Sequence, residues 1–295
     1  MHIPVLREEA IRYLAVKPDG GYADVTTGLG GHSAGIASRL RTGRLIALDR
    51  DEESLDMARA NLAMWADRIT FRRARFSELE AALDDIGAVD GLLADLGLSL
   101  MHLKTPERGF SFQSNGPLDM RLGRSEEVPT AADVVNFSSE KHLVEIFECF
   151  GEERRFGRKI ARALVRARPV RTTFDLVGIV ESVVPRTGRL HPATLIFQAL
   201  RIAVNNELEE LDALLGALPR VVKPGGRVVV LTYHSLEDRK VKHAMKEMAQ
   251  KGIAQVLTRH VVRPAKDEVL RNPPSRSAKL RAIEMLRVEE LRLRK

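Results

Sequence analysis

Cysteine, aromatic residues and long apolar runs are all scarce in this sequence. Cys149 is the only cysteine among 295 residues, which excludes a disulfide framework and any zinc or iron–sulfur site built from several thiolates. A lone thiol is also typical of a reducing compartment. No window approaches the roughly 18 apolar residues of a membrane span, and residues 1–4 lack the basic and apolar segments that open a secretory signal. We therefore expect a soluble, cytoplasmic protein.

The net charge of +7 is concentrated in two stretches of the chain. Residues 151–171 carry eight basic side chains against two glutamates, and residues 271–295 carry eight against three. The remainder of the chain is mildly acidic. Clustered basic charge favours a polyphosphate partner, although a solvated surface laced with salt bridges has the same composition.

Short aliphatic runs alternate with helix-like stretches in the first hundred residues. The predicted strands are 22–26, 44–49, 69–73 and 89–95. Helical patterns over 33–40 and 53–65 separate the first three strands. Such alternation predicts βαβ units and a parallel sheet, and the continuous apolar run of the second strand fits burial on both faces.

The alternation stops after the fourth strand and returns near residue 206. Residues 105–205 have a helical pattern, with a helix entry at 128–133. A turn at 223–226 precedes a strand at 227–233, and 255–262 and 278–286 predict an antiparallel hairpin at the sheet edge. The sequence therefore predicts an α/β domain of residues 1–104 and 206–295, interrupted by an all-helical insert of residues 105–205.

A glycine-rich segment, 24–33 (DVTTGLGGHS), follows the first predicted strand and opens a helix. Glycines let a ligand approach the backbone closely, and a helix N-terminus presents free N–H groups. The dinucleotide-binding pattern is only partly met, because Ser33 stands where a third glycine would be. A plain strand-to-helix turn capped by Ser33 is the alternative.

Two aspartates end predicted strands of the same sheet. Asp49 ends the second strand, where an acidic side chain accepts hydrogen bonds from ribose hydroxyls in nucleotide-binding folds. Asp95 ends the fourth. Because ligands of open parallel sheets bind at the carboxyl ends of the strands, we expect Gly30, Asp49 and Asp95 to converge there. Charges that merely mark a strand end or cap a turn are the alternative.

Two further motifs are candidates for substrate contacts. Phe110 and Phe112 lie close together in a chain with only 5% aromatic residues. Nucleic-acid bases stack on such rings, although packing in a core is the commoner fate of phenylalanine. His234 follows the strand 227–233 and is a candidate acid–base group or phosphate ligand, and Ser235 is a candidate helix cap.

With these residues in place, nearly the whole chain resembles the MraW family of small-subunit ribosomal RNA cytosine-N4 methyltransferases. The resemblance rests on motifs in one order: 30–33 (GGHS), Asp49, 95–97 (DLG), 108–112 (RGFSF), 116–121 (GPLDMR), 151–154 (GEER), 191–194 (HPAT), 197–202 (FQALRI) and 234–239 (HSLEDR). It implies a Rossmann-like S-adenosylmethionine-dependent methyltransferase sheet with an inserted helical domain for substrate recognition. The implied reaction is methylation of N4 of a cytidine in the decoding region of 16S rRNA, in the small ribosomal subunit, with no metal required.

The resemblance also implies the cofactor residues. They are Gly30, Gly31, His32, Asp49, Phe76, Asp95 and His102. His102 stands where the family has glutamine, and Leu100 and Met101 replace serine and proline. A histidine makes one hydrogen bond there, not the donor and acceptor pair of an amide, so this contact differs from that of the family.

Methyl transfer to an exocyclic amine needs alignment and an acceptor for the positive charge that develops on nitrogen. We expect the loop 95–99 to supply that acceptor, with Asp95 and Ser99 as the catalytic candidates. The base must leave its stack, and Phe110 and Phe112 are candidates to hold it. The candidate RNA contacts are Arg154, Arg155, Arg158, Arg162, His234 and Arg276.

One tetrapeptide resembles a different methyltransferase motif. Residues 272–275 (NPPS) are similar to the N-P-P-aromatic motif of amino-group methyltransferases, but the aromatic residue is missing and the strand that should precede it lies far away. We interpret it as a loop before the last strand, whose basic neighbours meet phosphates.

Other functions stay open from the sequence. A nicotinamide-dependent oxidoreductase would share the glycine loop and Asp49, but the missing third glycine and the basic clusters disfavour it. A non-catalytic RNA-binding module explains the charge and leaves the converging aspartates without a purpose. A methyl acceptor other than cytosine N4 is a third alternative. The sequence does not indicate an oligomeric state.

Overall fold

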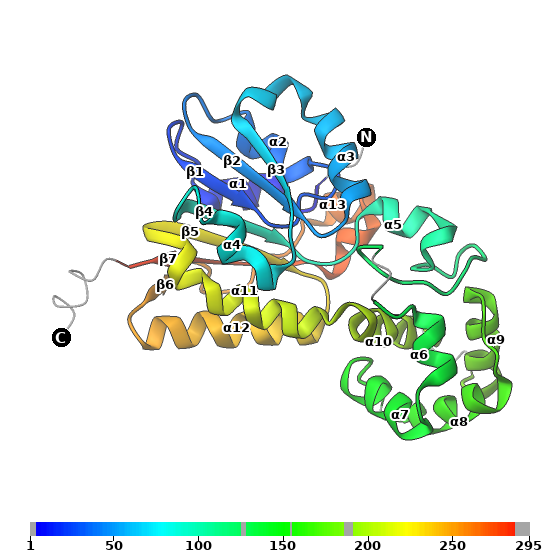
Figure 1. The fold of residues 1–295 in the computed structure, drawn as a ribbon. Helices are drawn as coiled ribbons and strands as arrows, with labels where there is room; N and C mark the ends of the chain where they lie inside the picture. The colour runs from blue at the N-terminus through cyan, green and yellow to red at the C-terminus, as the bar shows by residue number, and fades with distance from the viewer. Residues whose placement is uncertain (1–3, 125–127, 154, 186–190, 287–295) are drawn as a thin grey trace. The chain divides into compact units, whose positions relative to one another are not determined.

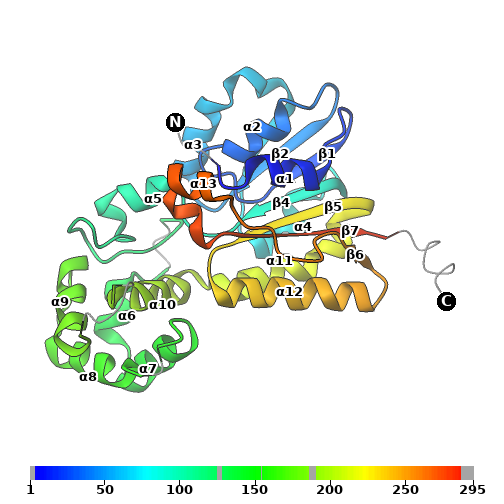
Figure 2. The same ribbon diagram turned by 180° about the vertical axis from the view of Figure 1, so that it is seen from behind.

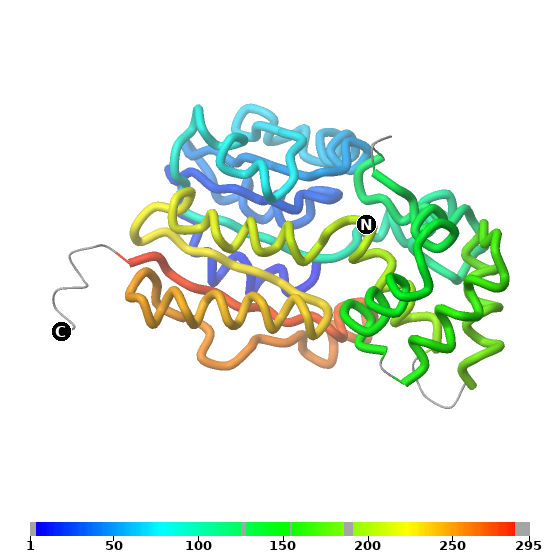
Figure 3. Tube along the Cα trace, turned by 60° about the horizontal axis from the view of Figure 1, so that its bottom comes forward, coloured from blue at the N-terminus to red at the C-terminus, as the bar shows by residue number. Residues whose placement is uncertain are grey.

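The computed structural model describes residues 4–124, 128–153, 155–185 and 191–286, and these residues form two units. The sheet unit contains the described residues within 1–97 and 209–295, and the helical unit contains those within 98–208. The boundaries expected from the sequence were 104/105 and 205/206. Figure 3 follows the chain from the sheet unit through the helical unit and back.

A seven-stranded sheet forms the first unit, in the order β3-β2-β1-β4-β5-β7-β6. Its strands are β1 (Gly21–Asp24), β2 (Arg44–Asp49), β3 (Ile69–Arg73), β4 (Val89–Asp95), β5 (Val222–Thr232), β6 (Ala254–Val256) and β7 (Lys279–Met285). The first five strands are parallel to one another, and β7 is antiparallel to both β5 and β6. The Rossmann-like α/β sheet expected from the sequence is therefore confirmed.

Helices cover both faces of this sheet. They are α1 (Arg7–Leu14), α2 (Gly31–Ala37), α3 (Glu52–Asn61), α4 (Leu79–Leu83), α11 (Glu207–Val221), α12 (Ser235–Gln250) and α13 (Lys266–Arg271), with 3-10 turns η1 (Ala63–Arg68), η2 (Phe76–Glu78) and η4 (Pro273–Ser277). In Figure 1 α11 and α12 run along one face, and Figure 2 shows α1 and α2 on the other. Crossover helices of this kind bury both faces of a parallel sheet.

Alternating side chains of each strand reach two separate hydrophobic cores. In β2, Ile46 and Leu48 join the core under α4, α11 and α12, whereas Leu45 and Ala47 join the core under α1, α2 and α3. Because successive strand side chains point to opposite faces, a strand buried on both faces needs an unbroken apolar run. This is why the run over 45–48 predicted the strand correctly.

The far edge of the sheet differs in detail from the sequence prediction. β6 and β7 pair antiparallel as expected, but β6 covers only Ala254–Val256, and Val262 returns as an isolated bridge to Leu280. At the start of β5 the pairing with β4 jumps from Val222 to Arg227. The predicted turn at 223–226 is therefore an irregularity inside the strand, with Gly225 at a φ of 80°.

The helical unit has its own core. Its elements are α5 (Leu100–Lys104), η3 (Pro106–Arg108), α6 (Ala131–Phe137), α7 (Glu140–Cys149), α8 (Gly157–Ala167), α9 (Thr173–Val183) and α10 (Ala193–Asn205). The predicted helix entry at 128–133 is confirmed, because the Thr130 side chain caps α6 and forms a capping box with Asp133. Thr172 and Asp175 begin α9 in the same way.

Candidate functional site

The carboxyl ends of β1 and β4 meet at the point where the strand order reverses. The chain builds outward from β1 through β2 to β3, and then resumes on the other side of β1 with β4 and β5. Such a switch point is where open α/β sheets bind their ligands. Here the backbone N–H of Asp95 donates to the hydroxyl of Thr26 at 2.6 Å, which joins the two strand ends.

The glycine-rich segment turns sharply above β1. Gly28 and Gly30 have φ angles of 51° and 87°, in the left-handed region that favours glycine. A Cβ on Gly30 would lie 2.8 Å from a methyl carbon of Leu62. The segment therefore brings bare backbone to the switch point, and that is the property a closely held cofactor requires.

Asp49 is tied to this loop. One of its carboxylate oxygens accepts the backbone N–H of Gly28 at 2.8 Å, and the other accepts that of Asp51 at 3.0 Å. The end of β2 and the glycine turn are therefore held together. The expected convergence of Gly30, Asp49 and Asp95 at one edge agrees with this geometry.

Asp95 lies between two polar side chains. Its Oδ1 accepts a hydrogen bond of 2.7 Å from the hydroxyl of Tyr233, and its Oδ2 lies 3.4 Å from Nε2 of His32. The His32 side chain is 6% exposed and that of Asp95 is 19% exposed, so a ligand reaches the carboxylate while the imidazole is enclosed. Nδ1 of His32 has no hydrogen-bond partner among the residues that the structure describes.

Tyr233 is a site residue that the sequence pattern does not indicate, because it stands as the last position of a predicted buried strand. Burial and then the Asp95 carboxylate raise the pKa of Tyr233 well above its usual value. The hydroxyl therefore stays protonated at neutral pH and acts as a donor. The only local signal was its place at the carboxyl end of a strand next to β4.

Asp24, at the end of β1, was likewise not singled out. It is fully buried, and it accepts the Ser33 hydroxyl at 2.6 Å and the Thr26 N–H at 3.2 Å. Burial raises the pKa of Asp24 to about 6, against the opposing effect of Ser33 and His32. Burial acts to lower the pKa of His32, but the Asp95 and Asp24 carboxylates outweigh it and raise that pKa.

The two remaining cofactor candidates lie in different units. Phe76 begins η2 in the sheet unit and packs, partly buried, against the core under α4 and α11. His102 belongs to the helical unit, where it is 4% exposed and its Nδ1 lies 3.1 Å from the Ser99 hydroxyl. Ser99 caps α5 by accepting the His102 N–H. The structure therefore gives Ser99 a local structural role.

Phe110 is a correction to the sequence-based expectation. Its side chain is 6% exposed and belongs to the core of the helical unit, so it offers no open ring face for a base. Phe112 is partly exposed, with ring centroids 4.7 Å from His191 and 5.0 Å from Phe197. Phe112 is the member of the pair that keeps a surface for stacking.

Arg108, which precedes these phenylalanines, is structural. It is 1% exposed and donates to the carbonyl oxygens of Arg121 and Leu122 at 3.1 and 2.6 Å. Gly109 has a φ of 69°, and a side chain there would collide with the Pro117 carbonyl. The two motifs at 108–112 and 116–121 therefore pack against each other and build the helical unit.

The helix cap predicted at Ser235 lies one residue earlier in the structure, at His234. His234 is the N-cap of α12, and Ser235 is its first helical residue. Nε2 of His234 lies 3.0 Å from Oε1 of Glu237, and the two side chains are 9% and 5% exposed. An enclosed imidazole paired with a carboxylate is poorly suited to bind a phosphate, so the expectation that His234 contacts RNA is not supported by its surroundings.

The basic candidates are largely exposed. Arg155, Arg158, Arg162 and Arg276 are all exposed, whereas Arg154 lies outside the described residues. Arg158 and Arg162 pair loosely with Glu148 and Glu140, at 3.7 and 3.4 Å.

The tetrapeptide 272–275 lies where α13 ends and η4 begins, directly before β7, in keeping with its interpretation as a connecting segment.

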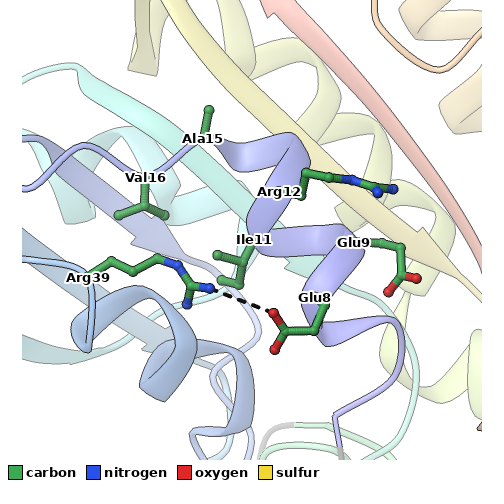
Figure 4. A pocket seen from close by; sticks show the side chains of 7 residues that line it. All are labelled: Glu8, Glu9, Ile11, Arg12, Ala15, Val16 and Arg39. Atoms are coloured by element: carbon green, nitrogen blue, oxygen red, sulfur yellow. Dashed lines mark ion pairs between the residues drawn. The ribbon is translucent and has the colours of Figure 1, made fainter.

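A separate hollow of about 520 Å³ lies beside α1 (Figure 4). Its lining residues are Glu8, Glu9, Ile11, Arg12, Ala15, Val16 and Arg39. Glu8 and Arg39 form an ion pair of 3.7 Å across it. None of the predicted site residues lines this hollow, so it contributes nothing to the switch-point site.

Among the residues that the structure describes, no helix is long and apolar enough to cross a membrane.

Known proteins are similar to this chain over nearly its whole length. The ribosomal RNA small subunit methyltransferase H of Solibacter usitatus is 54% identical over 287 residues, which cover 97% of this chain and 100% of that protein. The protein of the same name from Acidobacterium capsulatum is 49% identical, over 96% of this chain and 98% of that protein. Similarity to solved structures is weaker: an rRNA methylase from Streptococcus thermophilus is 11% identical, with 95% and 94% of the two chains covered and a TM-score of 0.43.

The model of one protein family, described as the MraW methylase family, matches residues 1–286. The match spans both units of the fold, and the two relatives have nearly the same length. The chain therefore belongs to the MraW methylase family.

Proposed function

We propose that this methylase transfers the methyl group of S-adenosylmethionine to N4 of a cytidine in the decoding region of 16S rRNA. The observation that carries the proposal is the joining of the Gly28–Gly30 turn, Asp49 and Asp95 at the switch point, in a chain of the MraW methylase family. The relatives named as ribosomal RNA small subunit methyltransferases support the substrate class.

The residues at the switch point fit a cofactor with a ribose and an amino-acid part. The positive-φ glycines leave no side chain over the turn, and Nδ1 of the enclosed His32 lacks a partner among the described residues. We assign Gly30, Gly31 and His32 to the part of the cofactor that lies against the glycine turn. We assign Asp49 to the ribose and Phe76 to the base. His102 stays a proposal that rests on the resemblance alone.

Bound there, S-adenosylmethionine supplies an electrophilic methyl group on a sulfonium. The protein's task is to hold the acceptor amine in line and to stabilise the positive charge on that nitrogen. Asp95 is suited to this, because its carboxylate is partly accessible and is held by the Tyr233 hydroxyl. Ser99 is no longer needed as a catalytic group, since it caps α5.

The cytosine must leave its stack to be methylated, and Phe112 is our candidate for the ring that holds it. The exposed basic side chains of α8 suit the RNA backbone. One side of this helix carries four basic residues: Arg158, Lys159, Arg162 and Arg166. Arg162 is three or four residues away from each of the others, which is the spacing of neighbours on a helix surface. The long pairs of Arg158 and Arg162 with half-buried glutamates at the surface are worth at most about 1 kcal/mol each, so phosphates replace those partners at little cost.

Arg276 adds a basic contact on the sheet unit. β7 runs antiparallel to β5, and its first residue, Lys279, pairs with Thr232 at the carboxyl end of β5. Arg276 comes three residues earlier and is exposed, so it lies at the sheet edge where Asp95 also ends its strand. We propose the small ribosomal subunit as the partner and the cytoplasm as the compartment of the reaction.

The test is methylation of 16S rRNA and of small subunits by the purified protein, followed by nucleoside mass spectrometry. We expect N4-methylcytidine to form with the wild type and not with Asp95→Ala. Asp90→Ala, which removes a carboxylate from the other end of β4, is the matched control and should stay active. Substantial turnover of Asp95→Ala would contradict the assignment of Asp95, and another methylated nucleoside would contradict the proposed acceptor.

Calorimetry separates the remaining alternatives. Binding of S-adenosylmethionine and not of a nicotinamide dinucleotide is expected, and the reverse result would favour an oxidoreductase. RNA binding without methyl transfer would favour a non-catalytic module.

A further inference from the structure

Tyr233 is the one hydroxyl donor that the structure places on the Asp95 side chain among the described contacts. The two residues are 138 positions apart in the sequence and meet because β4 and β5 are neighbours, with Asp95 paired to Leu231. The hydroxyl donates to Oδ1 at 2.7 Å, while His32 faces Oδ2. The carboxylate therefore has a short hydrogen bond at Oδ1 and a longer ion-pair contact at Oδ2, and Tyr233 contributes the stronger constraint on its orientation.

The Tyr233 side chain is itself held rigidly. Its backbone N–H donates to the Glu237 carboxylate at 2.9 Å. Its ring lies against Gly97, where an added Cβ would be 3.2 Å from Cδ2 and where φ is 114°. A bulkier residue at 97 would displace the ring. The backbone hydrogen bond and the contact with Gly97 therefore hold the Tyr233 ring so that its hydroxyl points to Asp95.

We propose that Tyr233 is a positioning residue, whose hydroxyl holds the Asp95 carboxylate in the orientation in which it acts on the cofactor and the incoming amine. This rests on the proposed function. A charge acceptor stabilises a transition state most when it is oriented before the reaction begins. Without the hydroxyl, the contact with His32 is what remains to the carboxylate among the described residues, and the group rotates more freely.

Tyr233→Phe tests the proposal with the smallest change, because the ring that packs on Gly97 is retained. A hydrogen bond to a charged group, once lost, corresponds to roughly a 10- to 100-fold effect. We expect the single-turnover rate of methyl transfer, at saturating cofactor and RNA, to fall by about that factor. RNA affinity should stay within about twofold, because the residues proposed for RNA contact are unchanged.

Tyr22→Phe is the matched control. Tyr22 is also a sheet tyrosine, 1% exposed, and its hydroxyl accepts the Lys17 N–H at 2.7 Å near the start of β1. This variant loses a buried hydroxyl but should keep the wild-type rate. If Tyr233→Phe matches Tyr22→Phe in rate, the positioning role is refuted.

A double-mutant cycle with Asp95→Asn asks whether Tyr233 acts through Asp95. The dissociation constant of S-adenosylmethionine, measured by calorimetry, should rise in Tyr233→Phe but change less than about twofold when Tyr233→Phe is added to Asp95→Asn. Equal effects in both backgrounds would overturn the proposal. If the wild type binds the cofactor and shows this coupling yet methylates no RNA, the proposed function fails and the positioning role stands.

Discussion

The hydroxyl of Thr26 accepts the backbone N–H of Asp95 at 2.6 Å, and this hydrogen bond joins β1 to β4 at the switch point. Thr26→Val keeps the shape of the side chain and removes the acceptor. Leaving a partly buried N–H without its partner costs about 1–3 kcal/mol, so we expect a lower free energy of unfolding and several-fold weaker cofactor binding. Denaturant unfolding and calorimetry measure the two effects.

Thr26→Ser is the control for this prediction, since it retains the hydroxyl. It should bind the cofactor like the wild type. Equal weakening in the serine and valine variants would contradict the role of the hydrogen bond, because the serine variant keeps the hydroxyl.

Gly30→Ala should damage the turn above β1. Its left-handed φ costs a residue with a Cβ about 1–2 kcal/mol, and that Cβ would press on Leu62 at 2.8 Å. We expect a lower unfolding midpoint and weaker cofactor binding. Gly178→Ala, in the interior of α9 with no atom within 4 Å of the new Cβ, should be neutral or slightly stabilising. Wild-type binding by Gly30→Ala would contradict a tight cofactor turn.

Asp24 should make the stability of the sheet unit depend on pH. Burial raises its pKa from 3.8 to about 6, so the native state binds a proton more tightly than the unfolded chain. The stabilisation is present below pH 4 and is lost as the pH rises through 6. Relative to the wild type, Asp24→Asn should therefore gain on the order of 2–3 kcal/mol between pH 4 and pH 7, as measured by denaturant unfolding at each pH.

Asp90→Asn is the comparison, because the pKa of Asp90 is shifted in the opposite direction and its effect on stability should change with pH in the opposite sense. Burial acts to raise the pKa of Asp90, but the Gly21 N–H and the Lys223 ammonium lower it overall. The stabilisation from Asp90 is therefore present above the ordinary carboxyl pKa and is lost as the pH falls. Parallel pH profiles for the two variants would contradict the assignment for Asp24.

Neutralising basic side chains in and just before α8 should weaken RNA binding and its salt dependence. The triple variant Arg155→Gln, Arg158→Gln and Arg162→Gln removes three exposed charges. If each meets one phosphate of a single strand, the slope of log affinity against log salt should fall by about 2, or roughly 0.7 per contact. Filter binding at several salt concentrations checks this prediction.

The control removes three arginines that already have protein partners near β3: Arg59, Arg68 and Arg72. It changes the net charge equally and should leave the slope close to that of the wild type. The same decrease in both variants would indicate a general charge effect and not an RNA contact on α8.

Much of the fold was determined by the sequence itself. The apolar run of β2 could only be satisfied by burial on both faces, and Ile69–Arg73 and Val89–Asp95 were predicted with the bounds that the structure has. The glycines at 28 and 30 and the aspartate at 49 follow from local rules, because φ and strand-end position depend on a few neighbouring residues.

Only the tertiary structure decided which side chains meet. Phe110 looked available for stacking but is enclosed in the helical core, and His234 looked chemically free but caps α12 against Glu237. Tyr233 reaches Asp95 because β5 lies beside β4, although the two residues are 138 positions apart. Periodicity and turn residues are properties of short segments, whereas the partner of a buried polar group depends on the order of strands that the whole chain must assemble.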